Sequence, residues 1–293
     1  MPIYQAIVLA IVQGLTEFLP VSSTAHLVLF PWFAHWTDPG LTFDVALHAG
    51  TLIAVFFFFW RRWMEMLGAA AGIGDKADPK VQENRRLFWY LVIATIPGGI
   101  AGYLLEKQAD AEFRTPVVIG VALVVVALFM WAGERMGKRD ESLGQVTLSD
   151  AVWIGIAQAF AVVPGVSRSG ATMTAGLFRG MDRESDARFS FLLSTPIIAG
   201  AALKKGLEIR HEGLPHEMRA PMLVGILISA VVGYIVIGWL IRYLATRTFT
   251  LFVIYRLALG ALVLIFARGH AIGTMGPVGP EAFAGFCLFA SLL

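Results

Sequence analysis

The sequence predicts an all-α polytopic membrane protein with two inverted-topology repeats, each a re-entrant helical hairpin plus three transmembrane helices, six full spans in total. Three observations predict this class. The 293 residues are 57% hydrophobic and only 15% charged, with a mean hydropathy of +0.70, whereas soluble domains are about 45–50% apolar and 25% charged. The apolar residues fall into separate runs of helical length. The same order of short and long runs occurs twice.

Two short apolar runs open the chain. The first, residues 3–12, continues as a helical pattern to Glu17, and Pro20 ends it. The second, residues 27–36, is equally short, whereas a full crossing needs about 20 residues. Irregular backbone at membrane depth is tolerated only where protein or a wet cavity surrounds it. We therefore expect a re-entrant hairpin whose polar elbow lies within residues 13–26.

Six longer apolar runs are each long enough to cross a bilayer. A hydrophilic stretch at 134–150 separates the first three from the second hairpin, which has its own short helices, a break at Pro164 and Gly165 and a polar elbow from Ser167 to Gly170. The predicted spans are 42–60, 87–105, 116–132, 189–205, 221–241 and 250–267.

The two halves of the chain align as an internal repeat. Gln13 placed on Gln158 puts residues 21–24 on residues 166–169, at a constant offset of 145. Three crossings are an odd number, so the second repeat enters from the opposite side, as in many transporters. The predicted boundaries are 1–268 for a single transmembrane domain, about 1–132 and 150–268 for its repeats, and 269–293 for a tail of unassigned role.

The distribution of basic residues predicts the orientation. The loops at 61–86, 133–148, 179–188 and 242–247 hold 14 Lys and Arg residues, and the connections on the other side hold 7. Cytoplasmic loops carry the excess of basic residues. The first set is therefore predicted to be cytoplasmic, and the mouth of the first hairpin faces outward.

Gln13 and Glu17 stand four residues apart and share one face of a helix. An acid inside a membrane is energetically expensive and marks a functional site by default. The pair could bind one ligand, or a hard cation such as Mg²⁺ or Ca²⁺. The alternative is a structural carboxylate hydrogen-bonded to amides of the elbow.

Three hydroxyl residues and a histidine follow the break at Pro20. Ser22, Ser23 and Thr24 lie where a helix start leaves backbone N–H groups unpaired and favours anions. For any one of them simple N-capping is the competing interpretation. His26 is a candidate general acid or base, or else a hydrogen-bonded core histidine.

Arg168 is the strongest single signal in the second elbow. A guanidinium between two short helices needs a partner, either Glu17 across the repeat axis or an anionic ligand such as a phosphate. Ser167, Ser169 and Thr172 supply hydroxyls there, and Gly170 allows close backbone approach.

Together these groups suit phosphoryl transfer: a base, a nucleophile or water, a proton donor and a charge clamp. The sequence has no GxxxxGK[ST] loop, so we expect a lipid phosphate rather than a nucleotide, and no nucleic-acid partner. A lipid-phosphate transporter or flippase is the alternative, because inverted repeats suit it equally well. A membrane phosphatase built on a lysine, two arginines and two histidines fits less well, since no lysine precedes residue 76.

The run QGLTEFLPVSSTAH at 13–26, with PGVSRSGAT at 164–172, resembles the bacterial undecaprenyl-diphosphate phosphatases of the BacA type. The resemblance extends to about Arg268. It implies hydrolysis of undecaprenyl diphosphate to undecaprenyl phosphate and inorganic phosphate, which recycles the lipid carrier of cell-wall synthesis and is linked to bacitracin resistance. It also implies a divalent cation, a location in the bacterial inner membrane and an active site open to the periplasm. A homodimer is left open.

The resemblance also suggests roles for individual residues. The predicted catalytic residues are Glu17, Ser23, His26 and Arg168; the predicted substrate-binding residues are Gln13, Ser22, Thr24, Ser167, Ser169, Gly170 and Thr172; the predicted metal ligands are Glu17 and Gln13. The attacking group is Ser23 or a water, and the sequence leaves both open. Two positions depart from the family pattern, since Gln13 stands where many relatives have glutamate and Ala25 where glycine is common.

Overall fold

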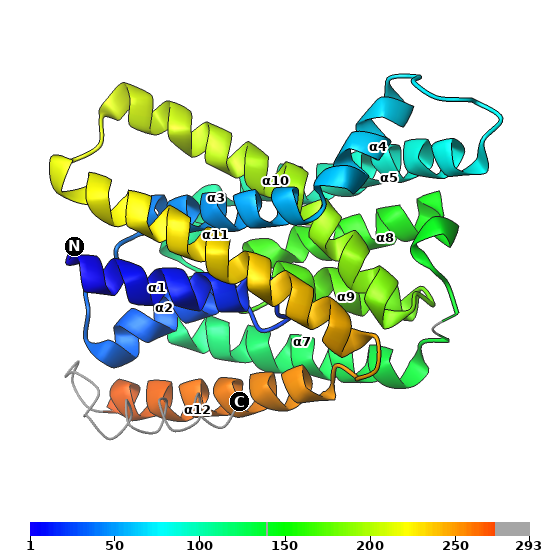
Figure 1. The fold of residues 1–293 in the computed structure, drawn as a ribbon. Helices are drawn as coiled ribbons and strands as arrows, with labels where there is room; N and C mark the ends of the chain where they lie inside the picture. Colours follow the sequence, from blue (N-terminus) through cyan, green and yellow to red (C-terminus); the bar gives the residue numbers. More distant parts are fainter. Residues whose placement is uncertain (139, 273–293) are drawn as a thin grey trace.

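The computed structural model describes residues 1–138 and 140–272, and every long element in that part of the chain is a helix (Figure 1). The helices long and apolar enough to cross a membrane are α3 (Leu41–Phe58), α5 (Pro79–Leu104), α7 (Pro116–Met136), α11 (His216–Leu244) and α12 (Thr250–Ile272). Large apolar side chains on them face outward; Phe57 is 62% exposed and Ile235 64%. Soluble monomers rarely expose apolar surface on this scale. The chain is a multi-pass membrane protein.

Each of the six predicted spans lies on a helix and overruns it by two residues at most. The span at 189–205 lies within α10 (Arg183–Glu212), which carries charged residues at both ends. α5 and α10 begin well before the apolar runs, at polar N-cap residues. The side chain of Asp78 caps α5, with Pro79 in the first turn, and Asp182 accepts from Ser185 N at 2.9 Å to cap α10.

The connection at 61–86 contains more helix than its polar composition suggested. It forms α4 (Trp60–Ala70) and the first turns of α5. Trp63 and Met66, three residues apart, are buried on one face of α4. Arg62 Nη2 donates to Glu83 Oε1 at 2.7 Å and joins α4 to α5. The helix is thus amphipathic, and the number of charged residues in this segment does not reveal the helical period of its buried residues.

Short helices flank both predicted elbows: α1 (Ile3–Thr16) and α2 (Ser23–Ala34) at the first, α8 (Leu148–Ala159) and α9 (Arg168–Phe178) at the second. Ser22 caps α2 by accepting from Ala25 N, and Ser167 caps α9 by accepting from Gly170 N at 3.0 Å. Both serines have positive φ, 76° and 70°. Few residues other than glycine adopt this conformation, so the two elbows share an uncommon local geometry. The remaining short elements are α6 (Glu106–Ala111), η1 (Leu143–Gln145) and η2 (Phe160–Val162).

The two elbows contact each other directly. Gly165 N in the second elbow donates to Ser22 Oγ in the first at 3.1 Å. Ser169 Oγ donates to Leu19 O at 3.0 Å in the other direction. Segments about 145 residues apart in the sequence therefore meet in the middle of the helix bundle.

Arg256, on α12, ties the elbows to the bundle. Its side chain is fully buried, and its guanidinium donates to backbone carbonyls of Pro20 at 3.1 Å, Gly165 at 2.7 Å and Leu123 at 3.3 Å. One cation thus joins the first elbow, the second elbow and α7. A buried charge of this kind is tolerated only when its donors are satisfied.

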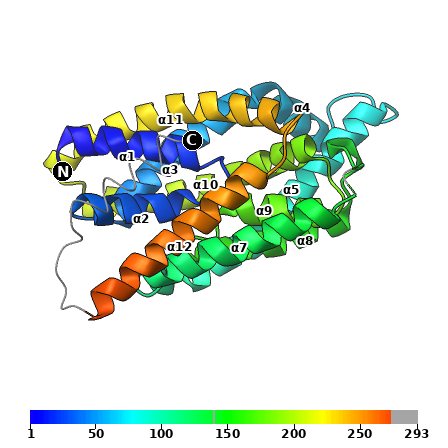
Figure 2. The same ribbon diagram turned by 90° about the horizontal axis from the view of Figure 1, so that it is seen from below.

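The longer helices pack against the short helices of the two hairpins. α11 packs along α1 and α3, α12 along α7, and α5 along α8. Figure 2 shows α1 and α2 side by side, and α12 crossing beside α7. Of the tail predicted at 269–293, residues 273–293 lie outside the described residues.

Candidate active site

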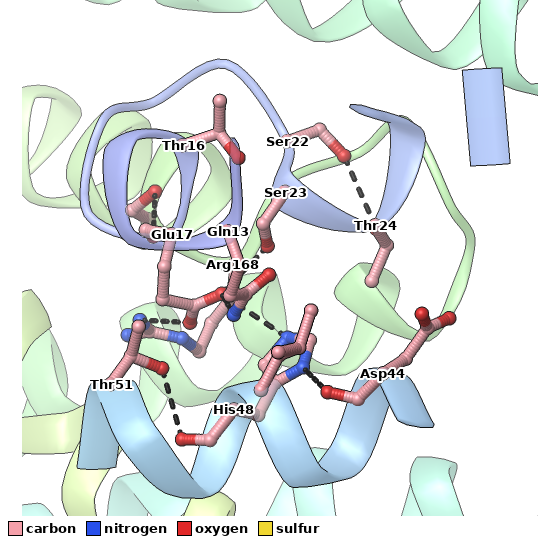
Figure 3. A network of polar contacts seen from close by, with 12 residues as sticks. Gln13, Thr16, Glu17, Ser22, Ser23, Thr24, Asp44, His48, Thr51 and Arg168 are labelled. Atoms are coloured by element: carbon pink, nitrogen blue, oxygen red, sulfur yellow. Dashed lines mark hydrogen bonds and ion pairs between the residues drawn. The ribbon is translucent and has the colours of Figure 1, made fainter. Parts of the chain in front are cut away.

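Glu17 is the centre of the polar cluster between the elbows (Figure 3). It follows the last turn of α1, and its side chain is only 5% exposed. Ser23 Oγ donates to Glu17 Oε2 at 2.6 Å, and Gln13 Nε2 donates to the same oxygen at 3.1 Å. Arg168 Nη2 donates to Oε1 at 3.0 Å. The carboxylate is therefore the point at which the two elbows meet.

A third element, α3, reaches the same carboxylate through His48. Its Nε2 lies 3.2 Å from Glu17 Oε2, and its Nδ1 lies 2.7 Å from Asp44 O (Figure 3). The Asp44 carboxylate accepts from Arg114 Nη1 at 2.9 Å, and Arg114 Nη2 also binds Asp38 at 2.9 Å. A polar path thus leads from Glu17 along the start of α3 to the connection before α7.

Ser23 and Glu17 have the arrangement of a nucleophile and its base. A serine hydroxyl is a weak nucleophile until an adjacent base takes its proton. Here the hydroxyl is 2.6 Å from a carboxylate oxygen, which is within the range for such a transfer. Ser23 is 8% exposed, so little solvent competes for the bond.

Arg168 begins α9 and holds a fixed position. Nη1 donates to Ser190 O on α10 at 2.9 Å, while Nη2 pairs with Glu17. Its Nε is buried without a hydrogen-bond partner. Buried donors are nearly always satisfied, so this N–H is a candidate to bind a ligand oxygen.

The other predicted binding residues build the elbows. Thr24 Oγ1 lies 3.3 Å from Ser22 Oγ, the oxygen that caps α2. Thr172 Oγ1 donates to Arg168 O at 2.8 Å and lies 2.7 Å from Ser190 Oγ. As described above, Ser167 and Gly170 form the cap of α9, and Ser169 binds the first elbow. These groups shape the site around Glu17 and Arg168.

His26 belongs to a neighbouring set of contacts. Nδ1 lies 2.7 Å from Ser22 O and Nε2 lies 2.6 Å from Tyr255 OH. A carbonyl only accepts, so Nδ1 is the N–H donor and Nε2 accepts from the tyrosine. Both ring nitrogens are engaged by groups other than Glu17. The structure therefore associates His26 with the elbow backbone and α12.

His48, Tyr255 and Arg256 were not among the predicted site residues. Each is a polar or ionisable residue in an otherwise apolar span, which is itself a signal of function in a membrane protein. Asp44 and His48 are also four residues apart, on one helix face. That signal could have found His48, but its contact with Glu17 depends on how α3 is rotated against α1.

The predicted metal ligands do lie together, yet the cluster does not fit a resident divalent cation. Ca²⁺ and Mg²⁺ take six or more oxygen ligands, which carboxylates, carbonyls and waters supply. Glu17 Oε2 already faces three donors and Oε1 pairs with Arg168, which leaves Gln13 Oε1 as a buried oxygen without a hydrogen bond. Among the described residues, no group of three or more His, Cys, Asp or Glu side chains could hold a metal ion.

Comparison with known proteins places the chain in a family. A family model described as "Bacitracin resistance protein BacA" matches residues 6–262. The "Undecaprenyl-diphosphatase" of Moorella thermoacetica is 52% identical over 265 residues, 90% of this chain and 97% of the relative. Proteins of the same name from Pelotomaculum thermopropionicum and Gemmatimonas aurantiaca are 48% and 49% identical, over 93% and 90% of this chain and 100% and 97% of the relatives. The chain belongs to the BacA family of bacitracin resistance proteins.

Proposed function

We propose that this protein is an integral membrane phosphatase that hydrolyses undecaprenyl diphosphate to undecaprenyl phosphate and inorganic phosphate. The family membership and the printed names of the relatives support this activity. The observation that carries it is the Ser23 hydroxyl 2.6 Å from Glu17 Oε2, with Arg168 on the other oxygen of that carboxylate. The site therefore combines an activated nucleophile with a cation for the transferred phosphate.

The proposed reaction has two displacements. Ser23 Oγ attacks the terminal phosphorus while its proton passes to Glu17 Oε2. The bond from that phosphorus to the bridging oxygen breaks, and the bridging oxygen leaves with the electron pair as undecaprenyl phosphate. Water then attacks the phosphorus of the phosphoserine, and the bond from that phosphorus to Ser23 Oγ breaks. Ser23 Oγ takes back the proton from Glu17, and inorganic phosphate leaves with the oxygen of the water. A water activated by Glu17 is the alternative attacker, and the short Ser23 bond favours the serine.

Arg168 stabilises the charge on the phosphoryl oxygens in this scheme. It retains a donor, Nε, that no protein group uses, and a guanidinium binds phosphate oxygens in a fixed geometry. His26 is assigned to holding the elbow through Ser22 O and Tyr255. We propose that Gln13 Oε1 would hold the divalent cation implied by the resemblance while the diphosphate is bound, and that the ion would offset negative charge on the diphosphate.

We further propose that the chain consists of two inverted repeats with re-entrant hairpins, in the bacterial inner membrane, with the site facing the periplasm. The shared capping and positive φ of Ser22 and Ser167 support the repeat. The 14-to-7 bias of basic residues supports the orientation. In Figure 1 the N-terminus and the α10–α11 connection lie at one end, and the α4–α5 and α11–α12 connections at the other.

Cysteine labelling tests this orientation. With Cys287 replaced, a cysteine at Lys107 should react with an impermeant thiol reagent on intact cells, and one at Lys76 should not.

Phosphate release tests the function directly. Purified wild type in detergent should release phosphate from undecaprenyl diphosphate, and EDTA should suppress the reaction. Glu17→Ala and Arg168→Ala should lose it. Binding of the lipid by wild type without phosphate release would refute the phosphatase and favour a lipid-phosphate transporter.

A further inference from the structure

We infer that His48 is a positioning residue for Glu17, holding Oε2 in place to accept the proton of Ser23. This inference rests on the proposed function. It is carried by the ring geometry, with Nε2 3.2 Å from Glu17 Oε2 and Nδ1 2.7 Å from Asp44 O. Because a carbonyl oxygen only accepts, Nδ1 carries a hydrogen. An ionised Glu17 also only accepts, so Nε2 carries one as well and donates to it.

The need for a second anchor follows from what Arg168 must do. Arg168 Nη2 holds Glu17 Oε1 at 3.0 Å, but the proposed reaction uses the same guanidinium for phosphoryl oxygens. When the guanidinium also binds a phosphate, its hydrogen bond to the Glu17 carboxylate weakens. Gln13 and His48 both bind the other oxygen, the one facing Ser23, and of these two only His48 comes from a different helix than Glu17. It can therefore keep the base aligned while Arg168 engages the substrate.

The α3 backbone around His48 is held in place by contacts with other elements. Ser229 Oγ on α11 donates to Leu47 O at 2.9 Å, immediately before His48. Thr51 Oγ1 donates to His48 O at 2.9 Å. The Asp44 end of the helix is fixed by Arg114 at 2.9 Å. The α3 backbone is thus held on both sides of His48, as the support of a side chain that orients a catalytic group needs to be.

Two substitutions separate a hydrogen-bond role from a packing role. His48→Leu keeps bulk but removes the donor, whereas His48→Gln keeps a neutral N–H donor of similar reach. We expect His48→Leu to lower kcat about 100-fold, as expected for misplacing a catalytic group. KM should stay within about twofold, because His48 contacts Glu17 rather than substrate. His48→Gln should recover about tenfold of the lost kcat.

The assay is phosphate release from undecaprenyl diphosphate, with His216→Gln, at an exposed position, as the matched control. Size-exclusion profiles and unfolding temperatures establish that each variant is folded. If His48→Leu does not fold, His48→Gln decides alone: a fall in kcat at constant KM supports the inference, and unchanged kcat overturns it. Equal losses in a folded His48→Leu and His48→Gln, or a loss confined to KM, would also overturn it. An inactive wild type would instead refute the phosphatase itself.

Discussion

Replacing Arg168 by lysine keeps the positive charge and removes the planar fork. The guanidinium donates to two acceptors, Ser190 O at 2.9 Å and Glu17 Oε1 at 3.0 Å, and its Nε has no hydrogen-bond partner. One ammonium group cannot occupy all of these positions. Arg168→Lys should therefore lose about one charged hydrogen bond, about 1.5–3 kcal/mol. That corresponds to a fall of about 10- to 150-fold in kcat/KM.

The matched control is Arg188→Lys. Arg188 pairs with Glu184 at 2.7 Å, with both side chains 38% exposed, and such surface pairs contribute about 0–1 kcal/mol. Phosphate release by purified proteins, measured over a range of undecaprenyl diphosphate concentrations, gives kcat/KM for each. The control should stay within about threefold of wild type. If Arg168→Lys did so too, the assignment of the guanidinium fork to the reaction would be wrong.

Three further predictions concern Gln13, Asp186 and Arg256. Gln13→Glu adds a carboxylate beside Glu17 and should lower the Ca²⁺ concentration for half-maximal activity about tenfold; an unchanged concentration would contradict the proposed use of Gln13. Burial, with a contribution from Asp182, raises the pKa of Asp186 well above its usual range, and neither carboxylate oxygen has a hydrogen-bond partner. The folded protein therefore retains a proton that the unfolded chain loses near pH 4, so stability falls as pH rises above that value. Asp186→Ala should raise the unfolding temperature more at about pH 7.5 than at pH 5, and equal shifts would refute this reasoning. Arg256→Met should lower the unfolding temperature, since each carbonyl left unpaired costs about 1–3 kcal/mol; no change would show that the carbonyls find other partners.

The elements were largely predictable because their signals are local. Apolar runs predicted the positions of the spans, and Pro20 and the break at Pro164 predicted the positions of the elbows. The predicted repeat places Ser22 and Ser167 at equivalent positions, and each of these serines caps a helix. The α4 helix was missed because its amphipathic period is masked by its charges.

The contacts within the site were predictable only in part. The sequence left two candidate partners for Arg168, Glu17 or an anionic ligand, because an ionisable residue needs a partner inside a membrane. The structure has the pair with Glu17. His48 meets Glu17 only through the rotation of α3. His26 meets Tyr255, 229 residues away, so its orientation depends on the packing of α12. No spacing rule along the chain encodes these contacts.

Rapid-quench analysis with undecaprenyl diphosphate labelled in its terminal phosphate tests the central claim most directly. Wild type should form labelled phosphoserine at Ser23 within the first turnover and then release labelled inorganic phosphate. Ser23→Ala should form no labelled enzyme. Phosphate release at the full rate from Ser23→Ala, without any phosphoenzyme in wild type, would contradict the serine mechanism and show that water is the attacking group.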